Sequence, residues 1–264
     1  MEVIDFGVSR LALIPVRKDA DNRSEQSSQL LFGDHYEVLD TSKDKEWLYI
    51  RIFADKYEGW INVKQHHSIS SEYFNQINYA NYKITTDLAS GILYKKSPLT
   101  VLMGSIVPIS NSELFKMEEQ FAFNGESKSL GQKRDFDFLK SIALKYIHAP
   151  YQWGGKSPFG IDCSGFTQMT FKICGYPISR DASEQKKCGK EVDGFGNALP
   201  GDLAFFSDTK GTVTHVGIIL EEEKIAHASG QVKIDVLVED GIIDTETKVI
   251  THFLSHIRRI LPES

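Results

Sequence analysis

The sequence predicts an α+β fold, in which a β-rich N-terminal half precedes a domain with helices first and an antiparallel sheet after. Short apolar segments separated by turn residues fill residues 1–70, which is typical of a small β-barrel. Apolar residues recur at helical spacing from 133 to 148 and again after Cys163. Strand-like segments then follow one another between Leu203 and the end of the chain. These patterns, in this order, support the prediction.

Residues 1–70 are expected to form the first of one or two small β-barrels. The expected strands are residues 9–17, 29–31, 36–39, 47–52 and 59–63. Turn clusters such as Gly33-Asp34 separate them at close spacing, as in small barrels. A fainter β-rich block, residues 75–130, is punctuated by glycine and proline. We interpret this block as a second barrel, and an elaborated linker is the alternative.

Residues 133–264 are expected to form one α+β domain that opens with a helix. From Lys133 to His148 the apolar residues make a single stripe at helical spacing. Pro150 ends this helix and leads the chain into a glycine-rich loop. A second helix follows that loop, and a short third helix is expected near 179–185. The strands expected after them are residues 203–206, 215–220, 224–228, 232–236 and 255–260.

Cys163 is the candidate nucleophile of this domain. The loop from Tyr151 onward leads into a segment whose apolar residues fall at helical spacing, and Gly175 and Pro177 stop that pattern. Cys163 therefore lies at or near a helix N-terminus, where unpaired N–H groups and the helix dipole favour a thiolate over a thiol. A buried structural cysteine is the alternative interpretation.

Two histidines downstream are candidate partners for a nucleophilic cysteine. Residues 214–220 and 224–228 have the pattern of paired strands joined by a turn of three glutamates. With that turn, Gly217 faces His227, and His215 is a diagonal neighbour on the same face, about 7–8 Å away between Cβ atoms. A two-residue turn would place the histidines on opposite faces. For either histidine alone, a solvated or hydrogen-bonded structural side chain is the simpler interpretation.

The composition indicates a globular protein with neither a nucleic acid nor a membrane as partner. The chain has 264 residues, 25% of them charged, and a net charge of −6 with no basic run. Its three cysteines show no metal-ligand spacing, and neither a metal nor an organic cofactor is expected. The N-terminus lacks the basic and apolar regions of a signal peptide. We therefore expect a cytoplasmic protein if Met1 is the native start, and otherwise a periplasmic or extracellular one after signal removal.

Four short motifs carry a family resemblance. They are Asp162-Cys163-Ser164-Gly165, Pro200-Gly201-Asp202-Leu203, His215-Val216-Gly217-Ile218 and His227-Ala228. In this order, over about residues 135–262, they resemble the NlpC family of papain-like cysteine peptidases. The N-terminal half is similar to bacterial SH3-like domains. The matching residues there are Gly33-Asp34, Trp47 and Gly59-Trp60-Ile61.

The resemblance implies a papain-like peptidase domain preceded by one or two SH3-like barrels. It extends to a subgroup that includes the γ-D-glutamyl-L-diamino acid endopeptidases (dipeptidyl-peptidase VI). Cys163 would attack an amide carbonyl and form a thioester, which water then releases. His215 would keep the thiol ionised and protonate the leaving amine, while His227 orients His215. The backbone N–H of Cys163 is one natural donor to the oxyanion.

The resemblance also implies several substrate-binding residues close to the nucleophile. Tyr151 and Trp153 would line the substrate groove, although both also suit a core. Asp162 and Ser164 would help to hold a free α-amine of the substrate, and the alternative for Asp162 is a helix cap. Ser183 belongs to a segment similar to one whose serine approaches the groove in the family, and a surface helix position is the alternative.

From the first barrel, the subgroup contributes an acid and a tyrosine that narrow one end of the groove. The best matches are Glu25 and Tyr57, which are otherwise ordinary loop residues. Two carboxylates and a phenol would form a closed, anionic pocket suited to an ammonium group. Such a pocket would select substrates that begin with L-Ala and carry a free amine.

The function predicted is hydrolysis of the γ-D-glutamyl–diamino acid bond in peptidoglycan stem peptides with a free N-terminal L-Ala. In the cytoplasm this reaction would serve murein peptide recycling, and we expect a monomer. One alternative is a secreted hydrolase that acts on intact peptidoglycan, with the SH3-like domains as wall anchors. Another is a non-catalytic module that binds wall peptides. An acyltransferase of related architecture is a more distant alternative.

Overall fold

The computed structural model describes residues 2–79, 82–107, 115–116 and 121–262, and the chain divides into two compact units. Unit 1 is Met1–Gln132 with Gly154–Pro158, and unit 2 is Lys133–Trp153 with Phe159–Ser264. The chain therefore leaves unit 2 after Trp153 and returns to it at Phe159, shortly before Cys163.

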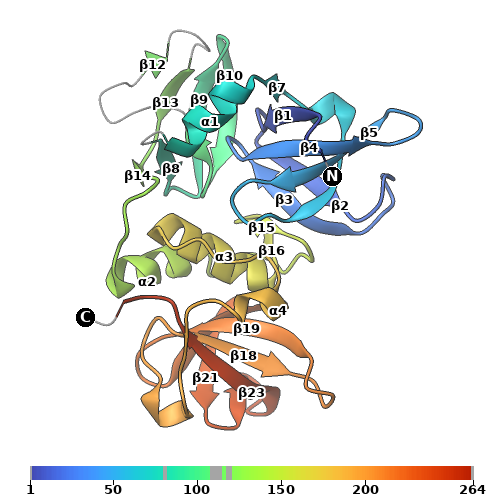
Figure 1. The fold of residues 1–264 in the computed structure, drawn as a ribbon. Helices are drawn as coiled ribbons and strands as arrows, with labels where there is room; N and C mark the ends of the chain where they lie inside the picture. The colour runs from blue at the N-terminus through green and yellow to red at the C-terminus, as the bar shows by residue number, and fades with distance from the viewer. Residues whose placement is uncertain (1, 80–81, 108–114, 117–120, 263–264) are drawn as a thin grey trace. The chain divides into compact units, whose positions relative to one another are not determined.

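Unit 1 begins with a seven-stranded antiparallel sheet in the order β3-β2-β6-β5-β4-β1-β7 (Figure 1). Its strands are β1 (Asp5–Val8), β2 (Leu13–Arg17), β3 (Gln26–Leu31), β4 (His35–Thr41), β5 (Trp47–Ile52), β6 (Glu58–Asn62) and β7 (Ser68–Ile69). Successive side chains point to opposite faces, so every second residue of β2 and β6 enters the core. The core residues are Ile14, Val16, Leu30, Tyr36, Val38, Leu48, Ile50, Ile52 and Ile61. The expected strand at 9–17 begins later, at Leu13, and β1, which has only four residues, was not predicted.

The remainder of unit 1 contains two smaller sheets, ordered β10-β9-β13-β12 and β11-β8-β14. The elements are η1 (Val63–Gln65), α1 (Ser71–Tyr79), β8 (Lys83–Thr85), β9 (Ala89–Tyr94), β10 (Ser97–Leu102), β11 (Ile106–Val107), β12 (Phe115–Lys116), β13 (Phe121–Asn124) and β14 (Ser127–Ser129). Phe32, directly after β3, packs with Val101 and Phe121 of the four-stranded sheet, and its carbonyl accepts the N–H of Ile106 in β11 at 2.8 Å. The division into one barrel at residues 1–70 and a second at residues 75–130 stays a prediction.

The segment Gly154–Pro158 packs within unit 1 and contains β15 (Lys156–Ser157). Gly154 has a φ of +73°, and a Cβ there would lie 2.3 Å from the carbonyl oxygen of Gln26. The backbone N–H of Lys156 donates to Oε1 of Gln29 at 2.8 Å. Only glycine fits this left-handed position so close to another backbone, so this part of the glycine-rich loop is held against β3.

Unit 2 opens with two packed helices, α2 (Phe136–Lys145) and α3 (Cys163–Cys174). Asp135 caps α2 through the N–H of Phe138, at 3.1 Å, so the helix predicted from Lys133 begins three residues later. It also ends before the predicted His148, because a turn precedes Pro150. Tyr146 and Phe166 meet edge to face at 5.8 Å between ring centroids and join the two helices.

The sheet of unit 2 has the strand order β17-β23-β18-β19-β20-β21-β22 (Figure 1). An additional pairing of β22 with β23 closes six of these strands into a barrel. The remaining elements are β16 (Gly160–Ile161), α4 (Ala182–Gln185), β17 (Lys190–Glu191), η2 (Phe195–Asn197), β18 (Leu203–Ser207), β19 (Val213–Ile219), β20 (Lys224–Ser229), β21 (Gln231–Val238), β22 (Gly241–Ile243) and β23 (Ile250–Arg259). Helix α3 packs against β19 and β20, which carry the two predicted histidines.

The register predicted for the histidine strands is confirmed. Gly217 pairs with His227, and the turn between β19 and β20 consists of the three glutamates. Glu222 and Glu223 have positive φ values of 58° and 56°, which close this turn. His215 and His227 consequently project from the same face of the sheet.

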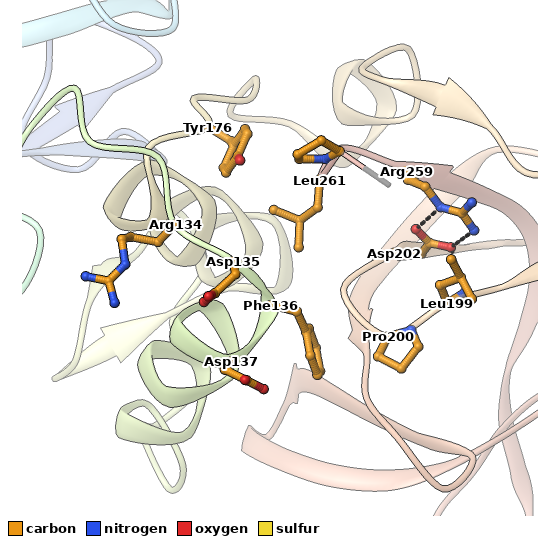
Figure 2. A pocket seen from close by; sticks show the side chains of 11 residues that line it. Arg134, Asp135, Phe136, Asp137, Tyr176, Leu199, Pro200, Asp202, Arg259 and Leu261 are labelled. Atoms are coloured by element: carbon orange, nitrogen blue, oxygen red, sulfur yellow. Dashed lines mark hydrogen bonds and ion pairs between the residues drawn. The ribbon is translucent and has the colours of Figure 1, made fainter. Parts of the chain in front are cut away.

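The Pro200–Leu203 motif connects the start of β18 to the end of β23 through an ion pair between Asp202 and Arg259. Asp202 accepts two hydrogen bonds from Arg259, both at 2.9 Å, and Gly201 has a φ of +94°. Asp202 and Arg259 line a pocket of about 410 Å³ together with Tyr176, Phe136 and Leu261. Figure 2 shows the ion pair and these side chains. The motif therefore has a structural role in the barrel.

Among the described residues, no helix has the length and apolar character needed to cross a bilayer. In the same part of the chain, no group of three or more His, Cys, Asp or Glu side chains could hold a metal ion.

Candidate active site

Cys163 is the first residue of α3 and is buried, with 7% of its surface exposed. Asp162 caps the helix by accepting the N–H of Gly165 at 2.7 Å. Backbone N–H groups of Ser164 and Val216 hydrogen-bond the sulfur of Cys163. Val216 follows His215 in β19, so the sulfur lies against the strand that carries the first histidine.

The two predicted histidines form a hydrogen-bonded chain that ends at a buried carboxylate. Nε2 of His215 lies 2.8 Å from Nδ1 of His227. Nε2 of His227 in turn lies 3.0 Å from Oδ2 of Asp235, which belongs to the neighbouring strand β21. All three side chains are buried. Asp235 was missed from the sequence, although its even spacing from His227 along a tight hairpin places both on one face.

A third histidine, also missed, covers the ring of His215. His252 of β23 stacks on it, with ring centroids 4.1 Å apart and planes inclined by 26°. Nδ1 of His252 lies 2.8 Å from Oγ1 of Thr251, which fixes its ring. Burial, and then the nearby His227, lower the pKa of His252 to about 4. The sequence offered no signal, because β23 is far from β19 along the chain.

Burial keeps both the cysteine and its histidine neutral in the free site. It raises the pKa of Cys163 to about 11, and the charge of Asp162 acts in the same direction. The hydrogen bonds at the sulfur lower this pKa but do not offset the burial. Burial also lowers the pKa of His215 well below its ordinary value, with His227 and His252 contributing. Desolvation therefore opposes the preference for a thiolate that was expected from the helix N-terminus, and it outweighs the backbone hydrogen bonds at the sulfur.

Asp162 and Ser164 both contact a buried arginine that sequence reasoning did not assign. Nη2 and Nη1 of Arg180 donate to the two carboxylate oxygens of Asp162 at 2.6 and 3.0 Å, and Nη1 also donates to Oγ of Ser164 at 2.8 Å. Gln185 donates to the carbonyl of Ser164 at 2.9 Å. The segment before and within α4 thus holds the first turn of α3 in place.

The other predicted site residues fall into two groups: Tyr151, Trp153 and Ser183 belong to unit 2, and Glu25 and Tyr57 belong to unit 1. Tyr151 is 38% exposed, and burial, followed by the charge that Cys163 carries as a thiolate, raises its pKa to about 12. Trp153 is 61% exposed, and Ser183 is exposed on α4. Glu25 and Tyr57 belong to unit 1, where Glu25 is paired with Lys18 at 3.7 Å and Tyr57 packs on the barrel core.

Two family matches agree with this geometry. Residues 148–251 match the NlpC/P60 family, and residues 16–65 match the bacterial dipeptidyl-peptidase Sh3 domain. The chain therefore carries an NlpC/P60 domain of papain-like fold behind an SH3-like domain. This combination defines the class of the protein, which is that of a cysteine peptidase.

Among individual proteins, the chain is similar to two bacterial dipeptidyl-peptidases. It is 29% identical to the gamma-D-glutamyl-L-lysine dipeptidyl-peptidase of Bacillus subtilis, over 76% of this chain and 71% of that protein. It is 27% identical to dipeptidyl-peptidase 6 of Lysinibacillus sphaericus, over 80% of this chain and 83% of that protein. The crystal structure of an NlpC/P60 family protein from Bacillus cereus shares its fold, with a TM-score of 0.82 at 20% identity, over 97% of this chain and 100% of that one.

Proposed function

We propose that the protein hydrolyses the γ-D-glutamyl–diamino acid bond of peptidoglycan stem peptides whose N-terminal L-Ala carries a free amine. The observation that supports this most directly is the buried Cys163 at the start of α3, against the strand that carries His215 and its partner His227. The similarity to proteins named gamma-D-glutamyl-L-lysine dipeptidyl-peptidase supports the choice of bond.

In the proposed reaction, His215 removes the proton of the Cys163 thiol as the sulfur attacks the γ-glutamyl carbonyl. The backbone N–H of Cys163, in the first turn of α3, donates to the oxyanion that forms. His215 then gives its proton to the leaving amine of the diamino acid, and the C–N bond breaks. Water, deprotonated by His215, hydrolyses the thioester, releases L-Ala-D-Glu and restores the thiol.

Asp162, Ser164, Glu25 and Tyr57 are proposed to recognise the α-amine of the substrate. Asp162 is already neutralised by Arg180, so we propose that it offers a hydrogen bond and little net charge. Glu25, whose ion pair with Lys18 is exposed and 3.7 Å long, is proposed to add negative charge for the ammonium group. Tyr151, Trp153 and Ser183 are proposed to line the peptide groove.

The test of the reaction uses free L-Ala-γ-D-Glu-diaminopimelate and its N-acetylated form. Each peptide is incubated with the wild type and with Cys163→Ala, and the products are identified by mass spectrometry. We expect release of Ala-Glu from the free peptide only, and by the wild type only. Cleavage of both peptides would favour a hydrolase of intact peptidoglycan, and cleavage of neither would favour the binding module.

Glu25→Gln tests the proposed amine pocket. Losing a charged partner of the ammonium should lower kcat/KM for the free peptide about 10- to 100-fold, the range for hydrogen bonds to charged groups. Glu46→Gln makes the same charge change at another exposed position of unit 1 and should have little effect. Equal activity of Glu25→Gln and the wild type on the free peptide would contradict the role of Glu25.

A further inference from the structure

We propose that Asp235 is a positioning residue that selects, through His227, the tautomer of His215 able to accept the Cys163 proton. The proposal rests on the function proposed above, because it assigns His215 the role of base. It extends the cysteine–histidine–histidine arrangement by one buried carboxylate from strand β21.

Asp235 is surrounded by hydrogen-bond donors. It is 1% exposed. Oδ2 accepts from Nε2 of His227 at 3.0 Å and from Nζ of Lys233 at 2.9 Å. Oδ1 accepts the backbone N–H and the hydroxyl of Thr245, both at 2.9 Å. Burial alone would raise the pKa of this carboxyl, but these donors lower it well below its ordinary value, so Asp235 is a carboxylate and accepts every bond it makes.

The direction of each hydrogen bond in the chain then follows from Asp235. Since the carboxylate can only accept, Nε2 of His227 carries a proton. A neutral His227 therefore has no proton on Nδ1, and that nitrogen must accept from Nε2 of His215 across their 2.8 Å contact. A neutral His215 with its proton on Nε2 has a lone pair on Nδ1. That nitrogen is the base available to the thiol.

The opposite tautomer is chemically possible and would disable the site. If His227 were protonated on Nδ1, it would donate to Nε2 of His215, whose proton would then lie on Nδ1. A protonated Nδ1 cannot accept the thiol proton. The stacked ring of His252 and the bond to His227 also oppose a flip of the His215 ring, which would exchange its two nitrogens. Asp235 thus selects the tautomer of His215 that can accept the thiol proton over the tautomer that cannot.

Asp235→Asn should impose the incompetent tautomer with little change of shape. The backbone N–H of Thr245 is a fixed donor, so the Asn carbonyl must face it and the amide NH₂ must face His227. Nε2 of His227 then accepts, and Nδ1 carries the proton. Lys233, which loses one acceptor, still pairs with Asp244.

Asp244→Asn is the matched control. Like Asp235→Asn, it removes one of the two carboxylates paired with Lys233, but Asp244 makes no contact with a histidine in the described contacts. Asp235→Asn should lower kcat/KM about 10³- to 10⁴-fold, as expected for a histidine held in the wrong tautomer. Asp244→Asn should stay within about threefold of the wild type.

Two measurements without substrate separate this inference from the proposed function. Long-range ¹H–¹⁵N spectra of histidine-labelled protein show which ring nitrogens are protonated. We expect His215 to carry its proton on Nε2 in the wild type and on Nδ1 in Asp235→Asn. Iodoacetamide labelling, with Cys163 distinguished by peptide mass mapping, should be slower in Asp235→Asn at neutral pH.

A proton on Nδ1 of His215 in the wild type would overturn the inference, even if Asp235→Asn failed to fold. So would an unchanged tautomer in a folded Asp235→Asn protein. A wild type that shows the expected tautomer but cleaves no peptide would instead overturn the proposed function and leave the assignment of Asp235 standing.

Discussion

At the scale of single residues, burial decides the chemistry of the site. The sulfur of Cys163 has two backbone donors and a helix N-terminus beside it, and each of these favours a thiolate. Desolvation nevertheless raises the pKa of the thiol and lowers that of His215. The resting pair is then a neutral thiol beside a neutral imidazole, and the proton moves when the substrate carbonyl is attacked. In such a pair His215 must accept the thiol proton during the attack, so its tautomer has to be fixed beforehand. In a pair that is already ionised the proton has moved before the substrate binds.

His252→Ala should shift the acid limb of the pH profile of kcat/KM to higher pH. This limb reports the free enzyme, in which His215 must be neutral to act as base. Burial is the main cause of its lowered pKa, and removing the stacked ring admits water and raises that pKa toward its ordinary value. Activity is lost as the pH falls through the pKa of His215, so when that pKa is raised the loss begins at a higher pH.

His252→Phe is the control for this prediction, because a phenyl ring retains the stacking and the burial without a titratable group. Its acid limb should stay close to that of the wild type. Identical profiles for the wild type and the alanine variant would show that the ring of His252 does not govern the protonation of His215.

At the scale of secondary-structure elements, α3 is held at its first turn by residues from one later segment. Arg180 and Gln185 reach Asp162, Ser164 and Thr167 through buried hydrogen bonds. The nucleophile lies in this turn. The start of α3 is therefore capped by Asp162 and is also hydrogen-bonded by Arg180 and Gln185. Both contributions hold Cys163 in place against β19.

Arg180→Met should destabilise unit 2 by about 3–5 kcal/mol, because it leaves the carboxylate of Asp162 buried without its cation. The shift of the urea midpoint of unfolding measures this loss. Adding Asp162→Asn removes the stranded charge and keeps an acceptor for the N–H of Gly165, so the double variant should recover part of the stability. A single variant as stable as the wild type would contradict the structural role of the pair.

At the scale of the whole molecule, the chain crosses between its two units around the loop that leads to the nucleophile. Residues 154–158 belong to unit 1, while Trp153 and Phe159 belong to unit 2. The stability of unit 1 therefore includes contacts made by a segment that lies in sequence next to the active-site helix. A change in this segment is expected to affect unit 1 although the segment lies far from the barrel in sequence.

Gly154→Ala should destabilise unit 1 by roughly 1–2 kcal/mol from the left-handed backbone alone, and by more through the contact with the carbonyl of Gln26. Hydrogen exchange of β3 should report the loss. Gly131→Ala, where an added Cβ meets no atom within 4 Å, is the control and should change stability by less than about 0.5 kcal/mol. Unchanged protection of β3 in the Gly154 variant would show that the loop contributes nothing to unit 1.

Local rules were sufficient to predict the helix start at Cys163 and the register that places His215 beside His227. They also offered the helix cap as the alternative interpretation of Asp162, which the structure shows. Helix caps and hairpin registers depend on residues a few positions apart, so the pattern of the sequence carries them. The α+β class and the family resemblance followed from the order of such local signals. The structure and the family matches agree with both.

Only the tertiary structure decided which groups surround Cys163, Asp162, His215 and His227. Arg180, Thr245 and His252 reach the site from separate segments, and no spacing in the sequence relates them to Cys163 or the two histidines. For Asp235 the sequence spacing gives only the shared face with His227, and the structure gives the hydrogen bond. The protonation of Cys163 and His215 was equally out of reach, because it depends on how much water the folded chain excludes. Sequence patterns record neighbours along the chain, whereas burial and long-range hydrogen bonds arise only when distant segments pack together.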